Sequence, residues 1–176
     1  MNQLEEEVAQ LLLAKKYTIA VAESCTGGLI AFRLTDVPGS SAFFERGAVT
    51  YSNRSKTEML GVPEAVIQKY GAVSEQTAKQ MAEGIRKQSG TDLGLAATGI
   101  AGPTGGTSEK PVGTVFIALS YDGGTECQKH LFPGDRGAIR HKTSETALTW
   151  VRNHCKAVMT KGREISGHFA YREGPV

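Results

Sequence analysis

A short apolar run that leads directly into a glycine-containing turn is the feature that most restricts the possible folds. Residues 17–22 read YTIAVA, a partly β-branched run typical of a buried strand. The run ends at Glu23, and residues 24–28 (SCTGG) come directly after it; we expect them to open a helix that continues to about residue 35. The N-terminal part of the chain is therefore predicted to be a strand, a tight turn and a helix.

The rest of the chain mixes further helices and strands. We predict helices over about residues 3–15, 54–60, 74–89 and 137–155, with a short one after Pro63, and strands over 44–51, 93–98, 112–121 and 125–132. The last two strands are predicted to form a hairpin through residues 122–124 (DGG). This mixture indicates an α/β protein, a three-layer α/β/α sandwich with a mixed sheet, and leaves the strand order open. We expect one domain over residues 1–155 and a flexible tail over 156–176.

Length and charge exclude several classes of protein. A chain of 176 residues usually closes one hydrophobic core, and its 40% hydrophobic and 22% charged residues are typical of globular proteins. A net charge of +2 provides no strong field for a polyanion, so no nucleic-acid partner is expected. No apolar run approaches the roughly 20 residues that span a bilayer, and the first seven residues are acidic where a signal peptide is basic. We therefore expect a cytoplasmic protein with no membrane partner.

The cysteines and histidines do not indicate a metal site. Cys25, Cys127 and Cys155 form an odd set without CxxC spacing, which argues against both a disulfide framework and a zinc site. The four histidines also lack the spacing of metal ligands. We expect no metal and no cofactor.

Ser24 and Lys56 are the first candidates for chemistry. A serine between a strand and a helix lies where free backbone N–H groups favour an anion or a developing oxyanion; the alternative is a simple helix cap. Lys56, one turn into a predicted helix, can take the serine proton if its pKa is lowered, whereas an ordinary surface lysine cannot. Cys25 is a rival nucleophile, because a helix N-terminus lowers the pKa of a thiol.

A glycine-rich loop and two arginines are candidates for binding an anion. Residues 98–106 (TGIAGPTGG) contain too many glycines for the interior of a helix or strand, and their backbone N–H groups can approach an anion closely. The alternative is a long loop that only connects two strands and whose glycines bind nothing. Arg136 and Arg140 stand four residues apart at the start of a predicted helix, where both can reach one phosphate. Surface salt bridges are the competing explanation for this pair.

Several of these runs occur together in an order that resembles one family. They are AESCTGG at 22–28, TYSN at 50–53 with Lys56, LGV at 60–62, GAVS at 71–74, TGIAGP at 98–103, KPVG at 110–113 and GDR at 134–136. The chain resembles, over roughly residues 3–155, the C-terminal domain of the competence and damage-inducible CinA proteins. That domain also occurs alone as nicotinamide-nucleotide amidohydrolase.

The resemblance implies an activity and a set of site residues. It implies hydrolysis of nicotinamide mononucleotide to nicotinate mononucleotide and ammonia, in pyridine nucleotide salvage, by a protein that tends to form homo-oligomers. By position it implies Ser24 as the nucleophile, Lys56 as the general base and Tyr51 as the residue that orients them. We expect the small-molecule nucleotide to be bound by Thr26, Gly27, Gly28, Thr98, Gly99, Gly102, Arg136 and Arg140. The competing interpretations are a non-catalytic nucleotide-binding or interaction module, and hydrolysis of a different amide such as nicotinamide riboside.

Overall fold

One mixed sheet of five strands forms the centre of the protein. The structure is a computed structural model and describes residues 3–166. The strands are β1 (Ile19–Glu23), β2 (Phe44–Val49), β3 (Leu93–Gly99), β4 (Thr114–Tyr121) and β5 (Gly124–Leu131), in the spatial order β2-β1-β3-β4-β5. β1 is parallel to both of its neighbours, whereas β4 is antiparallel to β3 and β5. The predicted mixed sheet and the hairpin are therefore confirmed.

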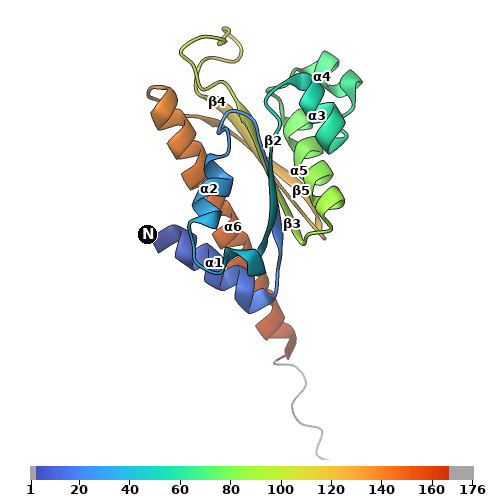
Figure 1. The fold of residues 1–176 in the computed structure, drawn as a ribbon, viewed down its shortest axis with the longest axis vertical. Coiled ribbons are helices and arrows are strands. Elements are labelled where there is room, and N and C mark those ends of the chain that lie inside the picture. The colour runs from blue at the N-terminus through green and yellow to red at the C-terminus, as the bar shows by residue number, and fades with distance from the viewer. Residues whose placement is uncertain (1–2, 167–176) are drawn as a thin grey trace, which may run out of the picture.

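Helices cover both faces of this sheet (Figure 1). One face carries α1 (Gln3–Lys15), α2 (Leu29–Thr35) and α6 (Arg136–Ser166), and the other carries α3 (Asn53–Leu60), α4 (Glu64–Tyr70) and α5 (Glu75–Ser89). A short 3-10 helix, Ser40–Ala42, precedes β2. The three-layer α/β/α arrangement agrees with the prediction. Within the described residues, no helix combines the length and apolar character that crossing a bilayer requires.

The side chains of the central strands alternate between two apolar cores. Ile19 and Val21 of β1 pack with the layer of α1, α2 and α6, whereas Ala20 and Ala22 pack with the layer of α5. Alanine also occupies the α5 side of the sheet at Ala96 in β3. These small side chains let α5 lie close to the sheet, and α3 in turn packs on α5.

Two predicted helix boundaries were wrong. Residues 24–28 form a turn and α2 begins only at Leu29, because Gly27 and Gly28 have φ values of 61° and 95°, which a right-handed helix does not contain. At the other end of the chain, α6 continues through the predicted boundary at Cys155 to Ser166. Residues 156–166 contain no proline, so nothing in their backbone chemistry ends the helix there. The remainder of the predicted tail, residues 167–176, lies outside the described residues.

Candidate active site

A cavity of about 360 Å³ opens where β1 and β3 end, at the carboxyl edge of the parallel strands. It is lined by seven of the predicted site residues, namely Ser24, Tyr51, Lys56, Thr98, Gly99, Gly102 and Arg136. A larger hollow of about 460 Å³ lies at the opposite end of the sheet, beside Tyr17, Arg86 and His154. Neither Ser24 nor Lys56 lines that hollow, so the candidate site is the cavity at the carboxyl edge.

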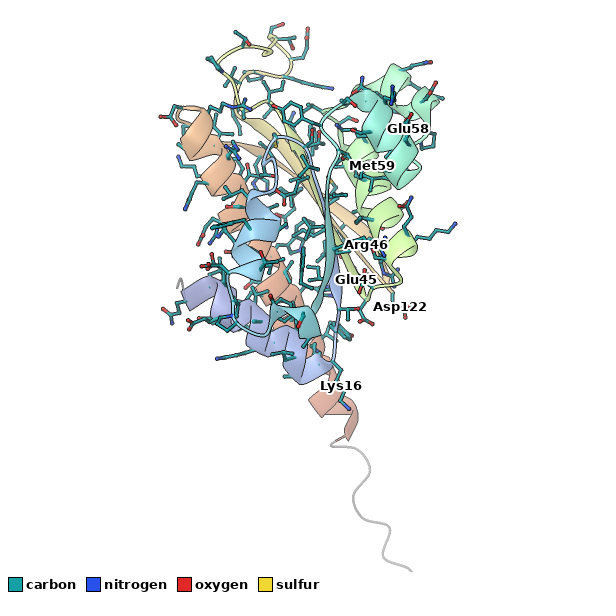
Figure 2. The ribbon with its side chains drawn as sticks, viewed as in Figure 1. Lys16, Glu45, Arg46, Glu58, Met59 and Asp122 are labelled. Carbon is teal, nitrogen blue, oxygen red and sulfur yellow. The ribbon has the colours of Figure 1, made fainter. Side chains whose placement is uncertain are left out.

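Lys56 is placed in the cavity wall by the way α3 begins. The Ser52 side chain accepts a hydrogen bond from the Ser55 backbone, and the Ser55 side chain accepts one from the Ser52 backbone, a reciprocal cap that fixes the first helical turn. Glu58 and Met59 on the same helix, both labelled in Figure 2, are exposed, whereas Lys56 is only 1% exposed. The alternative of an ordinary surface lysine is therefore wrong.

The Lys56 amine lies between two backbone carbonyls and the Ser24 hydroxyl. Its Nζ is 2.7 Å from the Thr50 carbonyl oxygen, 3.4 Å from the Tyr51 carbonyl oxygen and 3.1 Å from Ser24 Oγ. Burial lowers the pKa of Lys56, and the neighbouring Cys25 opposes this shift only in part. A neutral amine has two N–H bonds and one lone pair, and carbonyls can only accept. With both N–H bonds directed at the carbonyls, the lone pair is left for the serine proton.

Cys25, which directly follows Ser24, is not activated for nucleophilic attack. Its side chain is buried, and burial raises the pKa of its thiol from an ordinary 9.0 to about 12, with a further upward contribution from the charge of Glu23. Hydrogen bonds from the backbone of Cys25 and Thr26 act in the opposite direction without offsetting this rise. Because the thiolate is the reactive form of cysteine, Cys25 is a poor nucleophile near neutral pH. The expected lowering of its pKa was wrong.

Glu23 is a part of the site that the sequence analysis missed. Its carboxylate is 1% exposed and accepts hydrogen bonds from the backbone N–H groups of Gly28, Ile30 and Ala31 at 3.0, 3.1 and 2.8 Å. These are the groups that the start of α2 leaves free, and a carboxylate is the partner they favour. The position of an acidic residue at the end of an apolar strand was the available signal in the sequence.

Some of the remaining backbone N–H groups of the turn donate to carbonyl oxygens and others do not. The amide of Ser24 donates to the Ala97 carbonyl, and the amide of Gly27 donates to the Ser24 carbonyl. In the part of the chain that the structure describes, the amides of Cys25 and Thr26 donate to no oxygen. Both instead donate to the Cys25 thiol, and because sulfur is a weak acceptor, an oxyanion beside Ser24 would compete with it for these amides.

Tyr51 lies at the site with its side chain directed away from the serine–lysine pair. Its carbonyl approaches Lys56, but its hydroxyl accepts a hydrogen bond from Arg136 Nη2 at 2.9 Å, and the residue is 59% exposed. Arg136 Nη1 donates to the Gly102 carbonyl at 2.9 Å. Arg136 thus bridges Tyr51 and the glycine-rich loop, and the Tyr51 backbone rather than its ring contacts the base.

The structure separates the two predicted anion-binding arginines. Arg136 lines the cavity, whereas Arg140 does not and donates from Nε and Nη2 to the Thr26 carbonyl at 3.1 and 2.8 Å. Thr26, Gly27 and Gly28 also lie outside the cavity lining. The two guanidiniums therefore do not share one ligand position in this arrangement.

The glycine-rich loop is attached to the helical layer by side chains on both of its flanks. Thr98 Oγ1 donates to the Ala72 carbonyl at 2.8 Å. Lys110 Nζ, which the sequence analysis did not single out, donates to the carbonyls of Tyr70 and Val73 at 3.0 and 2.7 Å. The loop is therefore held over the segment between α4 and α5, with its glycines facing the cavity.

No metal-binding cluster accompanies this cavity. Among the residues that the structure describes, histidine, cysteine, aspartate and glutamate side chains nowhere gather in a group of three that could hold a metal ion. Cys25, Cys127 and Cys155 are free thiols, which agrees with the reading of their spacing. The candidate site is thus built from a serine, a lysine, backbone amides and one arginine.

Proteins of known sequence resemble this chain over most of its length. A CinA-like protein of Syntrophus aciditrophicus (strain SB) is 59% identical over 155 residues, which are 88% of this chain and 37% of that protein. A CinA-like protein of Syntrophotalea carbinolica is 54% identical over 151 residues, 86% of this chain and 37% of that protein. The chain therefore spans little more than a third of the length of the curated relatives it matches.

Solved structures share the fold. The competence damage-inducible protein A (ComA) from Klebsiella pneumoniae subsp. pneumoniae MGH 78578 superposes with a TM-score of 0.83 at 36% identity, covering 86% of this chain and 94% of that one. The competence/damage inducible protein CihA from Agrobacterium tumefaciens gives 0.81 at 42% identity, with the same coverage. The sequence model described as the CinA C-terminal domain matches residues 1–155.

Proposed function

We propose, since the chain belongs to the CinA C-terminal domain family, that it hydrolyses the carboxamide of nicotinamide mononucleotide to nicotinate mononucleotide and ammonia. The observation that carries this proposal is the buried Lys56 amine, 3.1 Å from Ser24 Oγ in the wall of the cavity. A hydroxyl beside a desolvated amine is suited to nucleophilic attack on an amide carbon. The family resemblance supplies the choice of substrate.

The reaction follows from the roles that these groups can take. Lys56 takes the proton of Ser24 as Oγ bonds to the carboxamide carbon, and the amides of Cys25 and Thr26 donate to the oxyanion. The protonated Lys56 then returns its proton to the leaving nitrogen, so ammonia departs and an ester with Ser24 remains. Water, deprotonated by Lys56, attacks this ester, and the carboxylate product leaves as Ser24 regains its proton.

The electrostatics of the site suit a cationic ring with an anionic tail. The pyridinium of the proposed substrate would further disfavour a charged Lys56, because like charges repel at short range. Arg136 is exposed at the rim of the cavity, and its two hydrogen-bond partners, the Gly102 carbonyl and the Tyr51 hydroxyl, are both neutral. A charged phosphate would therefore compete with them for the guanidinium. Arg136 and the glycine-rich loop at Gly99 and Gly102 are our candidates for the phosphate site.

Ammonia release tests the proposal directly. We expect the purified protein to release ammonia from nicotinamide mononucleotide and to act more slowly on nicotinamide riboside, which lacks the phosphate. Ser24→Ala and Lys56→Met should each lower kcat by at least about 10³-fold, because each removes half of a nucleophile–base pair. Cys25→Ala, which keeps its backbone amide, should retain most of the activity.

The outcomes separate the competing functions. A wild-type protein that binds the mononucleotide without releasing ammonia would be a binding module rather than an amidase. Equal turnover of nicotinamide riboside and nicotinamide mononucleotide would show that the protein does not recognise the phosphate, and would favour a different amide as the substrate. An inactive Cys25→Ala beside an active Ser24→Ala would refute the assignment of the nucleophile.

A further inference from the structure

The turn that carries the nucleophile is held from two sides by charged side chains that lie outside the cavity lining. We infer that one of them, Arg140, is a positioning residue that keeps the Ser24 turn in the geometry that attack requires, rather than a ligand of the substrate phosphate. This inference rests on the proposed function, because positioning has a meaning only for a reaction at Ser24.

Arg140 has a specific partner in this turn. Both Nε and Nη2 donate to the Thr26 carbonyl, at 3.1 and 2.8 Å, across 114 positions of the sequence. Within the described residues no carboxylate forms an ion pair with Arg140, so the carbonyl is not a secondary contact of a salt bridge. A guanidinium that directs two donors at one carbonyl fixes the direction in which that carbonyl points.

The fixed carbonyl controls the plane of a peptide bond next to the nucleophile. The Thr26 carbonyl and the Gly27 N–H belong to one planar unit, and the N–H donates to the Ser24 carbonyl at 3.1 Å. Gly27 and Gly28 have φ values of 61° and 95°, and glycine rotates between positive and negative φ at little steric cost. The Leu29 amide also donates to the Thr26 carbonyl, at 3.3 Å, so without Arg140 this unit would keep two backbone hydrogen bonds and lose both of its charged donors. Rotation of the unit would disturb the adjoining amide of Thr26.

Glu23 holds the far end of the same turn, independently of Arg140. Its carboxylate accepts from the amides of Gly28, Ile30 and Ala31, and none of these bonds involves Arg140. Removing the Arg140 guanidinium therefore leaves the start of α2 intact. We expect Arg140 variants to fold, and to differ from the wild type in how firmly the peptide bond between Thr26 and Gly27 is held in one orientation.

Kinetics on two substrates separate positioning from phosphate binding. Arg140→Met keeps the apolar stem and removes the donors, and it should lower kcat about 10- to 100-fold on nicotinamide mononucleotide and nicotinamide riboside alike, with little change in KM. Arg140→Lys should restore part of the loss, since one ammonium can still reach the carbonyl. Arg136→Met should instead raise KM for the mononucleotide more than for the riboside.

A matched control lies on the same helix. Arg152 pairs with Glu7 at 3.6 Å and touches no part of the cavity, so Arg152→Met should leave both kinetic constants unchanged. Thermal unfolding of all four variants checks that they are folded. Two results for Arg140→Met would overturn the inference. One is a rise in KM for nicotinamide mononucleotide with no change in kcat, and the other is wild-type kinetics on both substrates.

A substrate-free measurement keeps this inference separate from the proposed function. A fluorophosphonate probe bonds its phosphorus to Ser24 Oγ and releases fluoride, while Lys56 takes the proton, and mass spectrometry follows the labelled fraction. Arg140→Met should slow labelling by a factor similar to its loss in kcat. If the wild type is labelled but releases no ammonia, the proposed substrate fails and the labelling rates still decide the role of Arg140. If the wild type is neither labelled nor active, both proposals fail.

Discussion

Gly84 sets the distance between α5 and α3, and through α3 it sets the position of the proposed base. A Cβ added at Gly84 would lie 2.0 Å from the Leu60 carbonyl oxygen and 3.0 Å from its carbon. Leu60 is the last residue of α3, one helical turn after Lys56. To accept Gly84→Ala, α3 must move by roughly 1 Å or more, because non-bonded atoms do not approach as closely as this.

The expected cost is the balance of two opposing effects. In the interior of a helix, alanine is favoured over glycine by about 1 kcal/mol. Overpacking costs about 1–3 kcal/mol, and we expect the upper end because the contacted atom is backbone oxygen, which cannot rotate away as a side chain can. Gly84→Ala should therefore lower the free energy of unfolding by about 2 kcal/mol. A displacement of roughly 1 Å at Lys56 should also lower kcat about 100-fold.

Urea unfolding, monitored by the fluorescence of Trp150, the single tryptophan, measures the change in the free energy of unfolding. The rate of ammonia release measures the change in kcat. Gly137→Ala is the matched control, because a Cβ there would meet only Asp135 Oδ1, at 3.4 Å, on an exposed part of α6. The control should be at least as stable as the wild type. If Gly84→Ala is as stable and as active as the wild type, the reasoning about this helix contact is refuted.

Two further predictions concern protonation and an isolated hydroxyl. If Lys56 is the base, its neutral form is active, so kcat/KM should rise as the pH rises through its pKa, at a pH below its ordinary 10.5 because burial lowers the pKa. A pH–rate profile that is flat from about pH 5 to 10 would contradict this role. Thr50→Val should not destabilise the protein and should add up to about 1 kcal/mol to the free energy of unfolding, because Thr50 Oγ1 is buried and has no hydrogen-bond partner among the residues that the structure describes. A clear loss of stability in that variant would indicate that the hydroxyl does have a partner.

The sequence by itself determined most of the helices and strands and indicated the candidate site residues. Apolar periodicity predicted the strands and the order of helices, and the turn signal at residues 122–124 predicted the hairpin, because these signals act over a few neighbouring residues. The resemblance on short motifs indicated Ser24, Tyr51 and Lys56. It could not show which atoms of these residues meet.

Only the tertiary structure decided how each group is used. Lys56 and Ser24 are 32 positions apart, and their contact, with the burial that lowers the pKa of Lys56, depends on how α3 packs on α5. Packing against the layer of α1, α2 and α6 buries Cys25 and raises the pKa of its thiol, where the local pattern predicted the reverse. Arg140 finds the Thr26 carbonyl across 114 positions. Propensity and spacing describe a chain locally, whereas desolvation and the choice of hydrogen-bond partner depend on segments that only folding brings together.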